Sequence, residues 1–196
     1  MNSYQIVGIV LAGGASRRFG EPKALYHIDG RPFFQYSIEA LKNTVENITI
    51  VSQPELLESI KQQTTYEVIF DVEKFRGFGP LAGIYTCMKK VQSEWYVTLP
   101  CDTPFITEEI IIRLLSYTKK YPEQDAFIPK IAGKNQPLIA VYHRRCLPTV
   151  EKHLKEHQLK MGALFKVINT KFLDENEFNN FEAFRNINTK KDIAPD

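Results

Sequence analysis

The alternation of short apolar runs with helix-like stretches constrains the fold of this chain more than any other feature. The apolar runs expected to form strands are residues 6–11, 48–51, 68–70 and 95–99. The stretches expected to form helices are residues 32–41, 54–62, 81–91 and 107–121. Strands that are apolar almost throughout suit a parallel sheet covered on both faces. The repeated strand–helix order therefore predicts an α/β fold with three layers and a mainly parallel sheet.

The helix expected at residues 107–121 carries signals at both ends. Thr107 is an expected N-cap, with Glu108 and Glu109 in the first turn and Lys119 and Lys120 near the end. Acidic residues near the amino end of a helix and basic residues near its carboxyl end complement the helix dipole. The charge order thus predicts where this helix begins and ends.

Beyond about residue 125 the regular alternation of expected strands and helices ends. Two strands around a turn at Gly133, then a helix and two shorter segments, are expected at residues 126–129, 138–142, 148–157, 162–168 and 172–173. With 196 residues and no evident linker, the chain is predicted to form one domain, residues 1–196. We expect residues 126–196 to cover the ligand crevice and to shape a second substrate site.

The composition excludes several classes of function. Hydrophobic residues make up 43% of the chain and charged residues 24%, which is ordinary for a soluble globular protein. A net charge of +2 is too balanced for a nucleic-acid binder, so an anionic ligand must meet a local group of cations. No apolar run approaches the roughly 20 residues of a membrane span. Three cysteines, Cys87, Cys101 and Cys146, favour a reducing compartment. We therefore expect a cytoplasmic protein that binds neither nucleic acid nor membrane.

A glycine-rich loop follows the first apolar run, and residues 11–23 read L-A-G-G-A-S-R-R-F-G-E-P-K. A strand, a glycine-rich turn and then basic residues form a general arrangement for binding phosphate through backbone N–H groups. A P-loop is excluded, because five residues separate Gly14 from Gly20 and no lysine follows at once. The dinucleotide fingerprint is excluded because Gly13 and Gly14 are adjacent. On spacing alone, a plain turn with solvated arginines is an equal alternative.

Two carboxylates follow predicted strands. Asp71 comes directly after residues 68–70, and Asp102 lies in a turn flanked by prolines after residues 95–99. Open α/β sheets bind ligands at the carboxyl ends of their strands, so both are candidate ligand-binding residues. The alternatives are a turn-capping role for Asp71 and an Asx turn for Asp102.

One histidine pair has the spacing of metal ligands. His153 and His157 lie four residues apart on an expected helix, among lysines and a glutamate, and no third ligand is evident. We interpret this pair as part of a solvated helix face.

Four segments, in this order along the chain, resemble the molybdenum cofactor guanylyltransferase family, whose MobA-like members are nucleotidyltransferases of the sugar-nucleotide type. The segments are L-A-G-G-A-S-R-R-F-G-E-P-K at 11–23, G-P-L-A-G at 79–83, P-C-D-T-P at 100–104 and F-R-N-I-N-T at 184–189. The last departs slightly, because Lys190 stands where the family often has proline. The match spans nearly the whole chain and implies a Rossmann-like nucleotide-binding fold of the nucleotide-diphospho-sugar transferase type.

The resemblance assigns roles to individual residues. Backbone contacts with the nucleotide are implied for Leu11, Ala12, Gly13 and Gly14, and close approach to it for Gly79, Pro80 and Leu81. Lys23 matches the phosphate-binding lysine, Arg18 is a second candidate for phosphate, and Arg17 ranks after it. Asp71 is implied to recognise guanine, and Asp102 to bind Mg²⁺. Asn186 and Asn188 either support the metal and phosphates or cap a loop. Cys101 is interpreted as a small packed residue.

The implied reaction is Mg²⁺-dependent transfer of GMP from GTP to the terminal phosphate of molybdopterin, with release of pyrophosphate. Residues 1–125 would be the nucleotide-binding half and residues 126–196 the molybdopterin-binding half. Candidate pterin contacts are Lys134, Gln136, Arg144 and Lys160. Other proteins of molybdenum cofactor biosynthesis, or molybdoenzymes, are candidate partners. The alternatives are a related enzyme that uses CTP or a sugar phosphate, and a non-catalytic nucleotide-binding adaptor.

Overall fold

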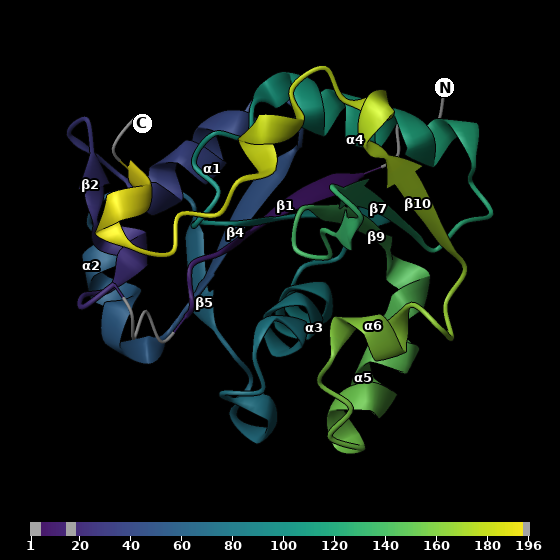
Figure 1. Cartoon of the computed structure of the whole chain (residues 1–196). Coiled ribbons are helices and arrows are strands. Elements are labelled where there is room, and N and C mark those ends of the chain that lie inside the picture. The colour runs from purple at the N-terminus through teal and green to yellow at the C-terminus, as the bar shows by residue number, and fades with distance from the viewer. Residues whose placement is uncertain (1–4, 15–18, 194–196) are drawn as a thin grey trace.

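The computed structural model describes residues 5–14 and 19–193, and a single large sheet runs through the middle of the molecule (Figure 1). The strand order is β10-β7-β9-β6-β1-β4-β5, with β8 paired to β7. The strands are β1 (Ile6–Leu11), β4 (Asn47–Ser52), β5 (Glu67–Phe70), β6 (Trp95–Pro100), β7 (Ala126–Ile131), β8 (Lys134–Asn135), β9 (Ala140–His143) and β10 (Thr170–Asp174). Strands from both predicted halves of the chain therefore share one sheet.

Strand direction places the carboxyl ends of four neighbouring strands at one edge of the sheet. β1 pairs in parallel with β4 and β6, and β4 pairs in parallel with β5. β9 runs antiparallel to β6 and to β7, and β7 pairs in parallel with β10. The predicted mainly parallel sheet is confirmed. The segments that leave β1, β4, β5 and β6 consequently begin side by side at the same edge.

Helices cover both faces of the sheet (Figure 1). One face carries α1 (Phe33–Leu41) and α4 (Glu108–Lys120), and the other carries α3 (Pro80–Lys90), α5 (Leu147–Lys155) and the short α6 (Met161–Leu164). α2 (Leu57–Lys61) precedes β5. Along β1, Val10 packs into the core on the α1 side, whereas Ile9 and Leu11 pack into the core on the α3 side. The apolar side chains on both faces of β1 are thus buried under helices, which confirms the three-layer prediction.

Several local predictions differ from the structure. Residues 54–62 form a 3₁₀ turn (Pro54–Leu56) before α2, and the strand predicted at residues 138–142 is β9, which begins at Ala140. Leu138 belongs instead to a turn, in which the Ile139 N–H donates to the carbonyl of Gln136 at 3.1 Å. Thr107 occupies the N-cap of α4 but its side chain makes no capping hydrogen bond. The charged residues at the two ends of α4 lie where the sequence placed them.

A two-stranded hairpin, β2 (His27–Ile28) and β3 (Arg31–Pro32), precedes α1 and was not predicted.

The interpretation of His153 as solvent-exposed is also wrong, because this side chain is buried on α5 with Nδ1 3.0 Å from the carbonyl oxygen of Thr149. In the part of the chain that the structure describes, no helix combines the length and the apolar character needed to cross a bilayer.

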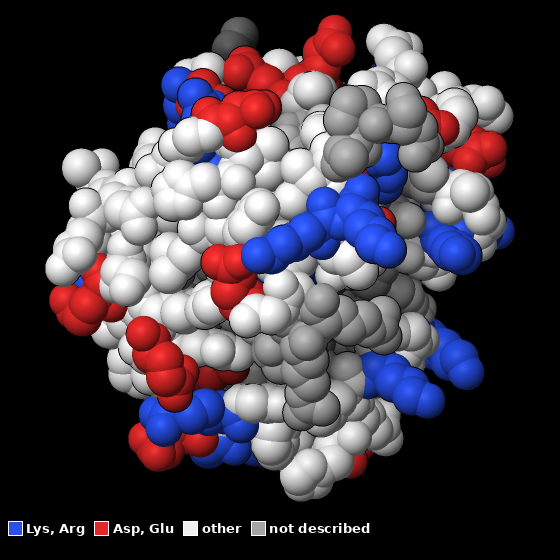
Figure 2. Space-filling model, turned by 60° about the vertical axis from the view of Figure 1, so that its left-hand side comes forward, with Lys and Arg blue, Asp and Glu red and all other residues white. Residues whose placement is uncertain are grey.

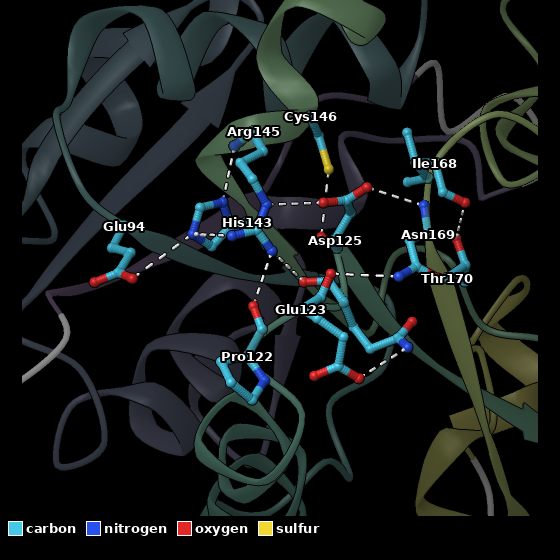
Figure 3. A network of polar contacts seen from close by, with 11 residues as sticks. Glu94, Pro122, Glu123, Asp125, His143, Arg145, Cys146, Ile168, Asn169 and Thr170 are labelled. Carbon is cyan, nitrogen blue, oxygen red and sulfur yellow. Dashed lines mark hydrogen bonds and ion pairs between the residues drawn. The ribbon is translucent and has the colours of Figure 1, made fainter.

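A polar network closes the edge of the sheet opposite the carboxyl ends of β1 and β6 (Figure 3). Arg145 donates through Nε to Asp125 at 2.9 Å, and the other oxygen of Asp125 accepts from the Asn169 N–H at 2.9 Å. His143 Nδ1 accepts from the Arg145 N–H at 2.9 Å, and His143 Nε2 lies 3.7 Å from Glu94. The network joins segments that adjoin β6, β7, β9 and β10, so we infer that it stabilises the fold.

His143 makes this network sensitive to pH. Burial, and then the charge of Arg145, lower the pKa of His143 below its ordinary 6.5, although Glu94 opposes them. A histidine that is neutral when folded takes up a proton on unfolding, so its stabilising effect is full above the ordinary pKa and is lost as the pH falls below it. We expect the free energy of unfolding to fall between about pH 7.5 and pH 5.5.

Denaturant titrations across this range would measure the effect. In the variant His143→Gln the decline should be shallower, and in His27→Gln, which changes an exposed histidine, it should match the unmodified protein. Equal slopes in all three proteins would contradict the assignment.

Candidate active site

A cavity of about 730 Å³ opens at the carboxyl edge of β1, β4, β5 and β6. Its lining residues are 11–14, 23, 24, 51–56, 71, 76, 77, 79, 80, 83, 100–102 and 138. Each of the four strands contributes the residues that follow it, which is where open α/β sheets bind ligands. Figure 2 shows Lys and Arg side chains in the middle and at the right of one face, and also beside Asp and Glu at its upper left and lower left.

The start of the glycine-rich loop is held by its neighbours in the sheet. The Ala12 N–H donates to the carbonyl of Val51 at 2.8 Å, and the carbonyl of Leu11 accepts from the Cys101 N–H at 3.1 Å. A Cβ added at Gly13 would lie 3.5 Å from the Ser52 carbonyl carbon. Leu11, Ala12, Gly13 and Gly14 all line the cavity, as predicted for a ligand-binding wall. Arg17 and Arg18 lie outside the described residues.

Lys23 and Asp102 form an ion pair in the cavity. Lys23 Nζ lies 3.3 Å from Asp102 Oδ2, and the two side chains are 13% and 27% exposed. The Asp102 turn is fixed by Thr103, whose hydroxyl donates to the carbonyl of Pro100 at 3.1 Å. Burial raises the pKa of the neighbouring Cys101 thiol to about 12, so this cysteine stays protonated and packs as a small residue. A cation and a carboxylate, both partly accessible, thus meet at the end of β6.

Asp71 lies at the other end of the cavity, directly after β5. Burial raises the pKa of its carboxyl group, while a hydrogen bond from the Gly77 backbone and the charge of Arg76 lower it. Three strand spacings separate β5 from β6, which at about 4.8 Å each puts the two ends of the cavity about 14 Å apart. That span matches the distance from a nucleobase to the phosphates of one nucleotide.

The G-P-L-A-G segment begins α3 beneath the cavity. Gly79 has φ +76° and ψ −161°, a conformation that strains other residues, and Pro80 follows as the first helical residue. Gly79 and Pro80 line the cavity. Leu81 does not, because its side chain is fully buried in the core. A Cβ on Gly83 would lie 3.1 Å from Leu11 and 3.3 Å from Val51, so glycine permits this close approach of α3 to the sheet.

The late asparagine segment meets the Asp102 turn. The Ile187 N–H donates to the carbonyl of Asp102 at 2.8 Å, which places Asn186 and Asn188 on either side of that contact. Both asparagines are exposed, and the Asn188 N–H donates to the Asp192 carboxylate at 2.8 Å. A backbone hydrogen bond thus joins the two sequence motifs, and Ile187 and Cys101 belong to the same hydrophobic cluster.

The second half of the chain contributes Leu138 to the cavity. Lys134 and Gln136 lie in or directly after β8, next to the carboxyl end of β7, which points the same way as that of β6. The structure does not bring Arg144 to the cavity, because its guanidinium donates to the Met88 carbonyl at 3.2 Å and to the Tyr96 hydroxyl at 2.7 Å. Arg144 follows β9, which is antiparallel to β6, so it lies at the opposite edge of the sheet.

Sequence reasoning missed some lining residues. Ser52 and Gln53 follow β4 just as Asp71 follows β5, so the strand-end rule could have found them. Arg76 and Glu55 lie within connections, and nothing in the residue pattern marks them. Arg76 is a cationic lining residue besides Lys23 in the described part of the chain.

The donor set bears on which metal the cavity could hold. Among residues 5–14 and 19–193, no group of three or more His, Cys, Asp or Glu is placed to bind a metal ion. Asp102 offers one hard oxygen ligand in the cavity. Mg²⁺ is commonly held by one or two carboxylates together with substrate phosphates, and this arrangement fits that mode of binding.

The fold and the cavity together define a nucleotide-binding α/β protein in which a glycine-rich wall, a lysine and a carboxylate meet at the ends of parallel strands. Residues 8–170 match the model of the MobA-like NTP transferase domain, and the chain belongs to this family. It is therefore a nucleotidyltransferase.

Individual relatives agree. The chain is 39% identical over 195 residues to a probable molybdenum cofactor guanylyltransferase of Halalkalibacterium halodurans, covering 99% of this chain and 98% of the relative. It is 42% identical over 190 residues to a protein of the same name from Geobacillus, covering 96% of each. The crystal structure of molybdopterin-guanine dinucleotide biosynthesis protein A from Archaeoglobus fulgidus superposes with a TM-score of 0.82 at 23% identity, covering 95% and 94% of the two chains.

Proposed function

We propose that this protein transfers GMP from GTP to the terminal phosphate of molybdopterin, forming the guanine dinucleotide cofactor and releasing pyrophosphate. The observation that carries the proposal is the layout of one cavity, with the Lys23–Asp102 pair at one end and Asp71 about 14 Å away at the other. This layout suits a nucleoside triphosphate whose base lies near Asp71. The names of the similar proteins supply the nucleotide and the acceptor.

The bound nucleotide would lie across the carboxyl ends of the strands. The backbone of residues 11–14 would follow the base, ribose and phosphates closely, because the two glycines of this wall carry no Cβ. Lys23 would turn from Asp102 towards the triphosphate and offset its charge. Arg18, outside the described residues, is proposed as a second phosphate contact. Asp71 would accept hydrogen bonds from guanine N1–H and the 2-amino group, donors that adenine lacks at these positions.

A divalent metal, proposed to be Mg²⁺, would be held by Asp102 together with the phosphates of GTP. When bound, such a metal supplies charge neutralisation on the phosphates. The residues of the chain hold Asp102 in place for this role through the Thr103–Pro100 turn and the Ile187 contact. Asn186 and Asn188 are proposed to support the same end of the site.

The acceptor needs no general base. A phosphate monoester has a second pKa of about 6 and is already largely dianionic at pH 7. At the Asp102 end of the cavity the described chain offers Lys23 as a cation, and the Cys101 thiol is neutral with a pKa of about 12. Catalysis would therefore rest on in-line positioning and on neutralisation of charge. Residues 126–196 are proposed to bind the pterin, with Lys134, Gln136 and Lys160 as contacts.

Pyrophosphate release is the direct test. Purified protein with molybdopterin and Mg²⁺ should release pyrophosphate with GTP and far more slowly with CTP or ATP. A preference for CTP would instead indicate the cytidylyl alternative, and tight GTP binding without any pyrophosphate release would indicate an adaptor.

A further inference from the structure

Arg76 lines the cavity, yet it belongs to none of the four motifs. It lies in the connection between β5 and α3, just after the 3₁₀ turn Glu73–Phe75. Its guanidinium pairs with Glu73 at 3.3 Å and lies 5.6 Å from the centre of the Phe70 ring. The side chain is 45% exposed, so a ligand in the cavity can reach it.

The position of Arg76 associates it with the base end of the cavity. Asp71 is the first residue of the same connection, and the positive charge of Arg76 lowers the pKa of the Asp71 carboxyl group. Lys23 and Asp102 lie at the far end, about 14 Å away by strand spacing. A cation beside Asp71 is therefore poorly placed to neutralise the phosphates, and its partner should be part of the base.

Guanine offers a matching partner. Its N1–H and 2-amino group are donors, and its O6 and N7 are acceptors on the adjacent edge. A guanidinium donates to O6 and N7 with two parallel hydrogen bonds, which is the commonest specific arginine–base contact. Adenine carries an amino group in place of O6, so the same arginine would face a donor.

We propose that Arg76 is a specificity-determining residue that donates to O6 and N7 of guanine while Asp71 accepts from N1–H and the 2-amino group. This inference rests on the proposed function, because it takes GTP as the nucleotide. The two side chains of one connection would then read both polar edges of the base. The Glu73 and Phe70 contacts hold the guanidinium near the cavity until the nucleotide enters.

Nucleotide analogues separate the two contacts. Binding of GTP, 7-deaza-GTP (which lacks N7), ITP (which lacks the 2-amino group) and ATP would be measured by calorimetry for the unmodified protein and for Arg76→Gln. The unmodified protein should bind 7-deaza-GTP about 5-fold or more weakly than GTP. In Arg76→Gln this difference should vanish while the penalty for ITP remains. The control Glu73→Gln removes the ion-pair partner but keeps Arg76, so it should retain the preference for GTP over 7-deaza-GTP.

Two results would overturn the inference. Equal affinity of the unmodified protein for GTP and 7-deaza-GTP would exclude a contact with N7. An equal loss of affinity for GTP, 7-deaza-GTP and ATP in a folded Arg76→Gln variant would show that Arg76 acts on the phosphates. If pyrophosphate is still released from GTP in either case, the proposed function stands and this inference alone fails; if the protein binds no GTP, both fail.

Discussion

Replacing Asp102 with alanine is expected to lower metal-dependent pyrophosphate release at least about 100-fold, because a bound metal contributes several kcal/mol of charge stabilisation. The fold should persist. The carbonyl of Asp102, not its carboxylate, holds Ile187, and its carboxylate contacts Lys23 in a cavity that is open to solvent. The loss would therefore reflect a missing metal ligand rather than a displaced turn.

Two measurements distinguish these causes. Circular dichroism should show an unchanged spectrum for Asp102→Ala, and binding of Mn²⁺ in the presence of GTP should weaken strongly. Glu39→Ala, which removes an exposed carboxylate on α1 that pairs with Lys42, should match the unmodified protein in both turnover and Mn²⁺ binding. Near-normal turnover of Asp102→Ala would contradict the assignment of Asp102 as a metal ligand.

The central sheet could be predicted because its strands are apolar on both faces, a pattern that leaves few alternatives. Short elements were harder. The β2–β3 hairpin turns at Asp29 and Gly30, whose φ angles are +49° and +76°, and Asp-Gly is a strong signal for such a two-residue turn. The paired strands are only two residues each, too short for an alternating pattern to appear. Helix α2 was predicted too long because Pro54 begins a 3₁₀ turn rather than the helix itself.

The candidate site was predictable where a residue follows a strand or belongs to a motif. Asp71, Asp102 and Lys23 all line the cavity for this reason. Arg76 could not be placed in the same way, because its position depends on how the connection after β5 folds. Gly77 and Gly79, with φ +79° and +76°, shape that connection, and both line the cavity. A positive φ cannot be read from the sequence alone, so the residues it positions are found only in the structure.

Replacing Asp71 with alanine is expected to reduce the preference for GTP over ATP about 10-fold or more, since a good bidentate contact with a base contributes about 1–3 kcal/mol of discrimination. Guanine N1–H and its 2-amino group would lose their acceptor, whereas ATP would lose nothing. Dissociation constants for both nucleotides with Mg²⁺ give the ratio directly. Glu55→Ala is a matched control, because Glu55 is another carboxylate lining the same cavity and should leave the ratio unchanged.

The raised pKa of Asp71 adds a second readout to the same experiment. Only the ionised carboxylate accepts from both guanine donors, so the preference for GTP should decline as the pH falls through the pKa of this group. Because burial raises that pKa, the decline should begin at a higher pH than an ordinary aspartate would give. Asp71→Ala should show a flat ratio over the same range. If Asp71→Ala kept the full preference for GTP, or kept the acid-side decline, base recognition would have to be reassigned to other residues of the cavity.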